Sequence, residues 1–213
     1  MPKPSNSPIR ILIVDDHPVV CSGLTSMLSA QSGFDIVGSA ASGEEALAII
    51  NRNRPDLLLL DLRMPGMDGI GVLQALKKIG DPPRVIILTS FDKDEDIYRA
   101  IRAGAQGYLL KDTTEAEMIC AIKVVNAGSR YIPRHIAARL ADRMMRSDLT
   151  ARELQILEQL AEGSTNKQIA ETLDISDNTV RHHVNSIMEK LQVSDRTEAV
   201  ATAIRSGVLS GTD

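Results

Sequence analysis

The fold is constrained most by a regular alternation, in the first half of the chain, of short apolar runs with amphipathic segments. Apolar runs of this length indicate strands, which we expect at Ile9–Val14, Asp35–Gly38, Leu57–Leu60, Val85–Leu88 and Tyr108–Leu110. Helices are expected between and after them, at Val19–Ala30, Glu44–Asn53, Gly69–Ile79, Asp94–Ala103 and Glu115–Ala127. Such alternation predicts an α/β domain with a parallel sheet and helices on both faces, and continuous Leu and Ile runs are typical of its buried strands.

The second half lacks such runs and is predicted to be entirely helical. Thr150 and Glu153 form a capping-box pattern that opens a helix reaching to about Glu162. Further helices are expected over residues 166–173, after Ser176 and after Ser194. Residues 129–147 contain a proline suited to a first helical turn and are predicted to form a linker helix between the two halves.

Composition and charge set limits on location and partners. The 213 residues carry a net charge of −4, with 14 basic and 16 acidic groups in residues 1–131 and 10 and 12 in residues 132–213. Neither half has the basic excess that indicates nucleic-acid binding, so a DNA-binding function must rest on a motif. No apolar run approaches the roughly 20 residues that span a bilayer, and no apolar leader follows Met1. We expect a cytoplasmic protein without a membrane partner, in which Cys21 and Cys120 are buried thiols.

Polar side chains directly follow four of the predicted strands. Asp15 and Asp16 follow the first strand, Asp61 the third, Thr89 the fourth and Lys111 the fifth. The carboxyl ends of parallel strands meet at one edge of the sheet, which is where such folds bind ligands. We therefore expect these five residues to converge.

Three carboxylates, a hydroxyl and an amine favour a particular chemistry. Neighbouring carboxylates repel one another, and a hard cation such as Mg²⁺, which prefers oxygen ligands, relieves that repulsion. A carboxylate can also attack a phosphoryl group and form an aspartyl phosphate, whose charge a lysine and a hydroxyl donor stabilise. His17 is interpreted as a loop residue before Pro18 and not as a metal ligand.

The segments ILIVDDHP, LLLLDLRMPGMDG, VIILTS and GAQGYLLKD, in this order, resemble the receiver domain of bacterial two-component response regulators. The resemblance covers residues 8–128 and implies a flavodoxin-like, five-stranded fold. It implies that Asp61 is the phosphoacceptor, that Asp16 binds Mg²⁺ directly and that Asp15 reaches the ion through water. The backbone carbonyl of Arg63 completes the implied protein ligands.

The same resemblance assigns three further roles. Thr89 and Tyr108 match the switch pair of the family, and Lys111 matches its phosphate-contacting lysine. This chain departs from many receivers at Asp112, where they have proline after the lysine.

In the helical half, one predicted helix has a face suited to DNA. The apolar residues Val180, Val184, Ile187 and Leu191 form one stripe, and the opposite side carries short polar groups and arginine: Asn178, Arg181, His182, Asn185 and Glu189. Arginine and asparagine can read base edges in the major groove. Together with the shorter helix before it, this segment makes a helix-turn-helix arrangement.

Residues 148–209 resemble the LuxR/NarL-type DNA-binding domain, a four-helix unit whose third helix reads the groove. The resemblance implies base contacts from Arg181, His182 and Asn185, and phosphate contacts from Lys167, Thr179 and Lys190. Many family members have lysine at the position of Arg181, so the class of protein transfers to this chain but the target sequence does not.

The sequence thus predicts a transcription factor and not an enzyme. A sensor histidine kinase is expected to phosphorylate Asp61 in the presence of Mg²⁺, which promotes homodimerisation, release of the recognition helix, or both, and controls binding to double-stranded DNA. Two alternatives stay open on the sequence alone. One is a hydrolase in which Asp61 is a turnover nucleophile, and the other is a regulator whose receiver acts without phosphorylation.

Overall fold

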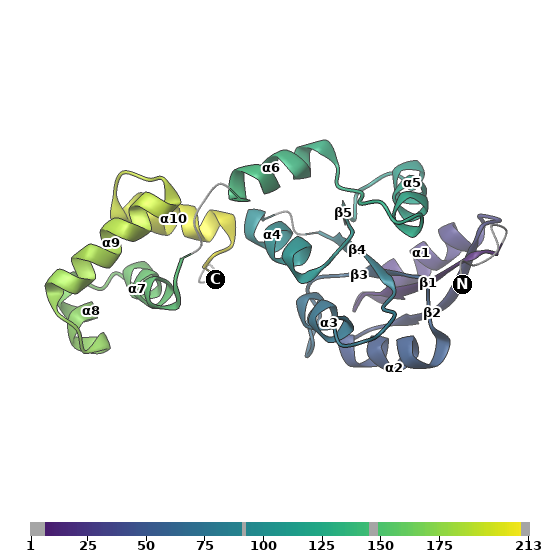
Figure 1. Ribbon diagram of the computed structural model, residues 1–213, viewed down its shortest axis with the longest axis horizontal. Helices are drawn as coiled ribbons and strands as arrows, with labels where there is room; N and C mark the ends of the chain where they lie inside the picture. The colour runs from purple at the N-terminus through teal and green to yellow at the C-terminus, as the bar shows by residue number, and fades with distance from the viewer. Residues whose placement is uncertain (1–6, 91–92, 145–148, 210–213) are drawn as a thin grey trace. The chain divides into compact units, whose positions relative to one another are not determined.

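The computed structural model describes residues 7–90, 93–144 and 149–209 (Figure 1). Contacts divide the chain into two compact units, one made by residues up to 92 with 96–138, the other by residues 93–95 with 139–213. The predicted linker helix corresponds to α6 (Arg134–Met144), whose residues are shared between the two units. The predicted boundary at residues 147 and 148 lies outside the described residues.

The first unit contains the predicted five-stranded parallel sheet. Its strands are β1 (Ile9–Val14), β2 (Phe34–Ala40), β3 (Leu57–Leu60), β4 (Arg84–Thr89) and β5 (Gly107–Leu110), in the order β2-β1-β3-β4-β5. Every residue of β3 is buried, as expected for a central strand with both faces covered. Val14 pairs with Leu60, and Thr89 pairs with Leu110, so the residues that follow these strands emerge at one edge.

Four helices connect these strands, a fifth follows β5, and together they cover both faces of the sheet (Figure 1). They are α1 (Pro18–Ser29), α2 (Gly43–Asn53), α3 (Gly69–Leu76), α4 (Asp94–Ala103) and α5 (Glu115–Asn126). Because side chains alternate along a strand, Ile11 and Ile13 face one side, where they pack with Leu28 of α1 and Ile122 of α5. The fold class is therefore as predicted, and the alternating faces explain why it needs helices on both sides.

Several helix ends differ from the prediction for local reasons. The third helix ends at Leu76 and not at Ile79, because Lys78 and Ile79 donate to the carbonyls three residues earlier, which closes a tighter final turn. The last helix is capped by Asp195, not Ser194, since the Asp195 carboxylate accepts from the backbone of Thr197 and Glu198.

Within residues 149–209, the regular structure of the second unit is all helical, as predicted. Its helices are α7 (Ala151–Ala161), α8 (Asn166–Leu173), α9 (Asp177–Leu191) and α10 (Arg196–Ser206). The predicted capping box opens α7, with both reciprocal hydrogen bonds between Thr150 and Glu153 present. The apolar stripe of α9 contributes Val180 and Ile187 to a single core that also includes residues of α7, α8 and α10.

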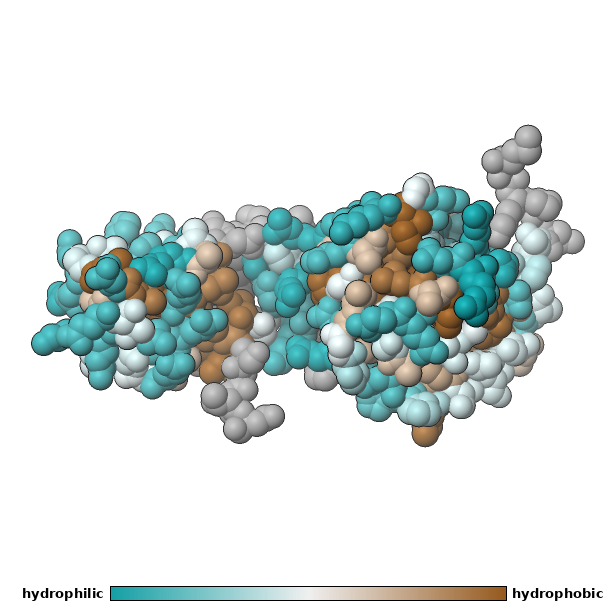
Figure 2. Space-filling view, turned by 90° about the horizontal axis from the view of Figure 1, so that it is seen from below, coloured by the Kyte–Doolittle hydropathy of each residue, from teal (hydrophilic) through white to brown (hydrophobic). Residues whose placement is uncertain are grey.

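Hydrophilic side chains cover most of the face seen in Figure 2, and hydrophobic ones gather in small patches between them. Among the described residues, none of the helices is both long enough and apolar enough to cross a membrane. Both cysteines are free thiols, but only part of the expectation holds: Cys21 is half-buried, whereas Cys120 is exposed. Cys120 lies on the exposed side of α5. The presence of one cysteine in a predicted helix does not show whether that cysteine faces the core or the solvent.

Candidate functional site

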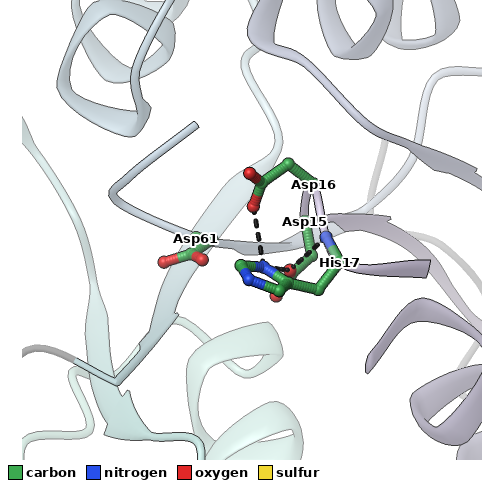
Figure 3. A group of neighbouring side chains, drawn as sticks. All are labelled: Asp15, Asp16, His17 and Asp61. Atoms are coloured by element: carbon green, nitrogen blue, oxygen red, sulfur yellow. Dashed lines mark hydrogen bonds and ion pairs between the residues drawn. The ribbon is translucent and has the colours of Figure 1, made fainter. Parts of the chain in front are cut away.

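The acidic residues predicted to converge lie together at the carboxyl edge of the sheet (Figure 3). Side-chain ligand atoms of Asp15, Asp16, His17 and Asp61 all lie within 4.8 Å of one another. Asp15 and Asp61 are each only 3% exposed, so two buried carboxylates face the same small volume. Such a pair requires a compensating positive charge.

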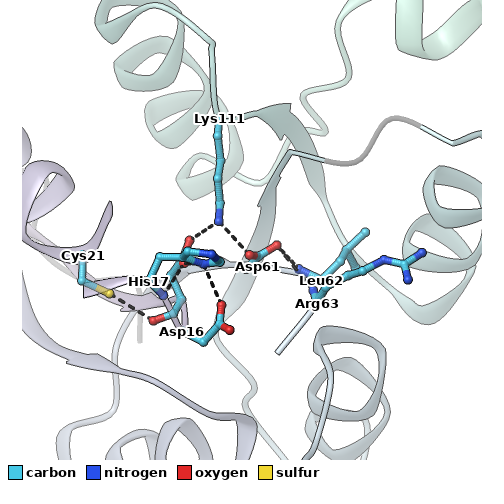
Figure 4. Close-up of polar contacts among 8 residues, drawn as sticks. Asp16, His17, Cys21, Asp61, Leu62, Arg63 and Lys111 are labelled. Atoms are coloured by element: carbon cyan, nitrogen blue, oxygen red, sulfur yellow. Dashed lines mark hydrogen bonds and ion pairs between the residues drawn. The ribbon is translucent and has the colours of Figure 1, made fainter. Parts of the chain in front are cut away.

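Lys111 provides that charge. Its Nζ lies 2.6 Å from Asp15 Oδ2 and 2.7 Å from Asp61 Oδ2, so one ammonium bridges the two carboxylates (Figure 4). Burial acts to lower the pKa of Lys111, but the hydrogen bonds to Asp15 and Asp61 outweigh it and hold the pKa above its ordinary value. Lys111 is therefore a fixed cation of the site.

The other oxygen of Asp61 is held by the backbone. Asp61 Oδ1 accepts from Leu62 N at 2.6 Å and from Arg63 N at 3.4 Å. The Arg63 guanidinium points away from Asp61 (Figure 4) and pairs instead with Asp96 of α4 at 3.0 Å. Arg63 thus contacts Asp61 through its backbone N–H and not through its side chain.

Thr89 and Tyr108 are completely buried on neighbouring strands. Ile87 pairs with Tyr108 and Thr89 pairs with Leu110, so Thr89 and Tyr108 lie on the same face of the sheet, two residues apart in register. Lys111 N donates to the Thr89 carbonyl at 2.9 Å, which joins the lysine to the end of β4.

Two residues of this site were not predicted as members of it. His17 Nδ1 lies 3.1 Å from Asp15 Oδ1 and 2.8 Å from Asp16 Oδ1, so the imidazole folds back over the acidic pair. Cys21 Sγ donates to the Asp15 carbonyl at 3.3 Å, and burial, followed by the Asp15 charge, raises the pKa of this thiol. For His17, the one indication in the sequence was Pro18. This proline begins α1 and so places His17 at the N-cap of that helix, directly after the acidic pair.

The oxygen donors of the cluster fit a hard divalent cation. Carboxylates of Asp15, Asp16 and Asp61 supply only oxygen, which Mg²⁺ prefers. Asp16 Oδ1 is buried and receives no hydrogen bond of good geometry, although His17 Nδ1 is near it. An enclosed carboxylate oxygen without a proper donor suits a cation ligand.

The second unit presents the face predicted for DNA. On α9, Asn178, Arg181, His182, Asn185 and Glu189 are exposed, while the apolar stripe is buried. The helical periodicity therefore divided this helix correctly between core and solvent.

The residues assigned to DNA differ in their contacts in the free protein. Lys167, His182 and Asn185 are exposed. Thr179 Oγ1 lies 2.8 Å from Ser176 Oγ, and Arg181 Nε lies 2.8 Å from Asp177 Oδ2.

Lys190 is held inside the unit by Glu153, which from sequence was predicted only as a member of the capping box. Its Nζ lies 2.7 Å from Glu153 Oε2, and Ser186 Oγ donates to Glu153 Oε1 at 2.7 Å. Burial acts to raise the pKa of Glu153, but the hydrogen bonds from Lys190, Ser186 and Thr150 lower it to about 2. Glu153 therefore joins α7 to α9 by a charge pair whose carboxylate is buried and whose ammonium is partly exposed.

Comparison with known protein families agrees with both halves of this description. Residues 11–123 match the response regulator receiver domain, and residues 147–203 match the bacterial regulatory proteins of the LuxR family. These matches span more than half of the chain.

Individual relatives match over nearly the whole length. The transcriptional regulatory protein LiaR of Bacillus subtilis is 39% identical over 95% of this chain and 100% of that protein. The crystal structure of response regulator ChrA, from a heme-sensing two-component system, is 38% identical with a TM-score of 0.57, covering 95% of this chain and 100% of that chain. RcsB of Salmonella enterica serovar Typhimurium, bound to a promoter in the presence of the phosphomimetic BeF₃⁻, shares the fold with a TM-score of 0.73 at 23% identity, covering 94% and 100%.

The chain therefore belongs to the two-component response regulators, in the branch with a LuxR-type DNA-binding domain. This is a class of transcription regulators and not of enzymes.

Proposed function

We propose that this regulator is switched by phosphorylation of Asp61, with a sensor histidine kinase as the phosphoryl donor. The observation that carries the proposal is the Lys111 bridge between Asp15 and Asp61 at the carboxyl edge of the sheet. A half-buried lysine that contacts the acceptor carboxylate is well placed to contact a phosphoryl group attached to it.

The transfer needs little from the protein beyond position and charge. An Asp61 carboxylate oxygen forms a bond to phosphorus as the phosphorus–nitrogen bond of the kinase phosphohistidine breaks, and the imidazole leaves with that electron pair and takes up a proton. Lys111 and the Thr89 hydroxyl stabilise negative charge on the transferred phosphoryl oxygens.

The same site has the residues to hold Mg²⁺. Asp15, Asp16 and Asp61, with the backbone carbonyl of Arg63, form the proposed ligand set. Bound there, the ion would offset the charge of the phosphoryl oxygens. Metal binding must displace contacts within the cluster, because His17 Nδ1 and Lys111 Nζ already approach its carboxylates.

Phosphorylation is proposed to act through Thr89 and Tyr108. Movement of Thr89 toward the phosphoryl group changes the space available to Tyr108 on the same face of the sheet, and Tyr108 repacks. This shifts an equilibrium between two conformations toward a homodimer, toward a free recognition helix, or both.

The output is binding to double-stranded DNA in the cytoplasm. Arg181, His182 and Asn185 are proposed to reach base edges, and Lys167, Thr179 and Lys190 to contact phosphates. Binding of a related regulator to promoter DNA supports this proposal, as does the exposed polar face of α9. The receiver is proposed to span residues 8–128 and the DNA-binding domain residues 148–209, joined by a linker over 129–147.

The test is intact mass of the full chain after incubation with a small phosphodonor and Mg²⁺. Wild type should gain one phosphoryl group, and Asp61→Asn should gain none. Asp81→Asn, which removes an exposed carboxylate from a loop, is the matched control and should behave as wild type. Sizing of the same samples separates the two proposed routes: a shift to a dimer with phosphorylation would support dimerisation, and an adduct without that shift would favour release of the recognition helix.

Other outcomes would each contradict a stated part. No adduct in the presence of Mg²⁺ would favour a regulator that acts without phosphorylation. Rapid, continued release of phosphate from small phosphoesters would instead indicate a hydrolase.

A further inference from the structure

The exposed face of α9 contains a charge pair at its start. Arg181 Nε lies 2.8 Å from Asp177 Oδ2, one helical turn earlier, with the two side chains 68% and 42% exposed. Asp177 is the first residue of the helix and Arg181 the fifth. The N-terminal residues of a recognition helix are those that contact base edges.

The pair fixes how the arginine presents its donors. Asp177 Oδ2 accepts a hydrogen bond from Arg181 Nε. The two terminal nitrogens, Nη1 and Nη2, are left without another partner among the described residues. These two groups form the planar fork that binds two acceptors at once. A lysine at this position, as in many family members, has no such fork and acts as a point charge.

The contribution of Asp177 to the folding stability of this unit is too small to account for an aspartate at this position. An exposed ion pair one turn apart contributes little, and a carboxylate near DNA phosphates opposes binding unless another interaction compensates. The second unit has no basic excess to offset that repulsion, since residues 132–213 carry 10 basic and 12 acidic groups.

We propose that Asp177 is a positioning residue that orients Arg181 to read guanine in the major groove. The inference rests on the proposed DNA-binding function and adds the base and the pair of residues that specify it. Guanine is the base that offers two adjacent acceptors, O6 and N7, to a bidentate arginine. Pairing with Asp177 also restricts the rotation of a long side chain before DNA binds, which favours the matched base.

The experiment is selection from a randomised duplex library by the full chain, with and without prior treatment with a phosphodonor and Mg²⁺. The proteins are wild type, Arg181→Ala, Arg181→Lys, Asp177→Ala and Asp177→Asn. Glu158→Ala is the matched control, because it removes the same charge from an exposed position of the same unit, on α7. Preference at each base position is then read directly from the selected sequences.

Wild type should select a site with a guanine preferred by about tenfold or more at one position of each half-site. Arg181→Ala and Arg181→Lys should lose that preference. Asp177→Ala should reduce it to about threefold or less while affinity for unselected DNA is kept or increased, because a negative charge is gone. Asp177→Asn should retain most of the preference, since its amide oxygen still accepts from Nε, and Glu158→Ala should leave it unchanged.

Four results would overturn the inference. If Asp177→Ala selects guanine as strongly as wild type does, Arg181 needs no positioning by Asp177. An equal loss of affinity for all sequences, with a lower unfolding temperature, would mean that Asp177 only stabilises the start of α9. If Asp177→Ala instead loses a preference for cytosine, Asp177 itself reads a base. If wild type selects no motif under either condition, the DNA-binding function fails first and the inference with it.

Discussion

Replacing Glu153 by glutamine should destabilise the DNA-binding unit and leave the receiver unaffected. Glu153 is 3% exposed and carries the buried negative charge that holds Lys190 of α9. Glutamine keeps the size of the side chain and one acceptor oxygen but removes the charge. Lys190 would then lose its ionic partner in a largely covered position, where it is 22% exposed.

The size of the effect follows from the pKa of Glu153. The pKa is about 2 in the folded protein against an ordinary 4.5, and this difference corresponds to about 3 kcal/mol of stability at neutral pH. For a domain of this size, such a loss lowers the unfolding midpoint by roughly 12–24 °C. Because the folded carboxyl keeps its charge to lower pH than the unfolded one, this stabilisation is fully present above pH 4.5. It is lost as the pH falls from 4.5 toward 2.

The chain offers a direct way to observe the two units separately. Its three tyrosines and two phenylalanines all lie in the first 131 residues, and it has no tryptophan, so tyrosine fluorescence reports only the first unit, which contains the receiver. Helical circular dichroism reports both units. Glu153→Gln should therefore move one helical transition and leave the tyrosine transition in place.

Glu158→Gln is the matched control, an exposed glutamate on the same helix. The reasoning is refuted if Glu153→Gln and Glu158→Gln melt alike, or if the wild-type transition shows no added acid sensitivity over Glu153→Gln between pH 4.5 and pH 2.

Three more predictions concern the receiver. Gly69→Ala should cost about 1–3 kcal/mol by tyrosine-monitored unfolding, because a methyl group there would overlap the Asp61 carbonyl oxygen and lie 2.9 Å from Leu62 Cα. Gly23→Ala, in a helix and with nothing within 4 Å of the added carbon, should instead stabilise by roughly 0.5–1 kcal/mol, and equal effects would contradict the packing argument. Lys111→Gln should lower receiver stability, since it leaves two buried carboxylates without their cation, and Mg²⁺ should raise its melting temperature more than that of wild type. Chelation of divalent cations should abolish phosphoryl uptake measured by intact mass, and uptake that persists in chelator would contradict the proposed role of the metal.

The acidic site could be predicted from sequence because topology alone brings it together. Asp15, Asp61 and Lys111 each follow a strand, and parallel strands end at one edge, so no side-chain packing had to be known. Helical periodicity separated the core and exposed faces of α9 for the same reason: the pattern depends on local geometry only.

Contacts that join distant segments could not be predicted in this way. The pair of Glu153 and Lys190 spans 37 residues, and in sequence the first reads as a helix cap and the second as a phosphate-binding lysine. The edge of β5 gives another example, where Tyr108 N donates to the Tyr131 carbonyl and Tyr131 N donates to that of Gln106. Through these hydrogen bonds, Tyr131, a single residue of the connection after α5, pairs with β5. The sequence around Tyr131 has no strand-like apolar run that would have predicted this pairing.

The central claim is that phosphorylation of Asp61 controls DNA binding. The most direct test is to measure the affinity of the full chain for a library-selected duplex before and after treatment with a phosphodonor and Mg²⁺. Fluorescence anisotropy of the labelled duplex, at one fixed salt concentration, gives both values. Wild type and Asp81→Asn should bind about tenfold tighter or more after treatment, within the usual range of coupling between two sites, and Asp61→Asn should not change. Equal affinity of wild type before and after stoichiometric phosphorylation would contradict the account.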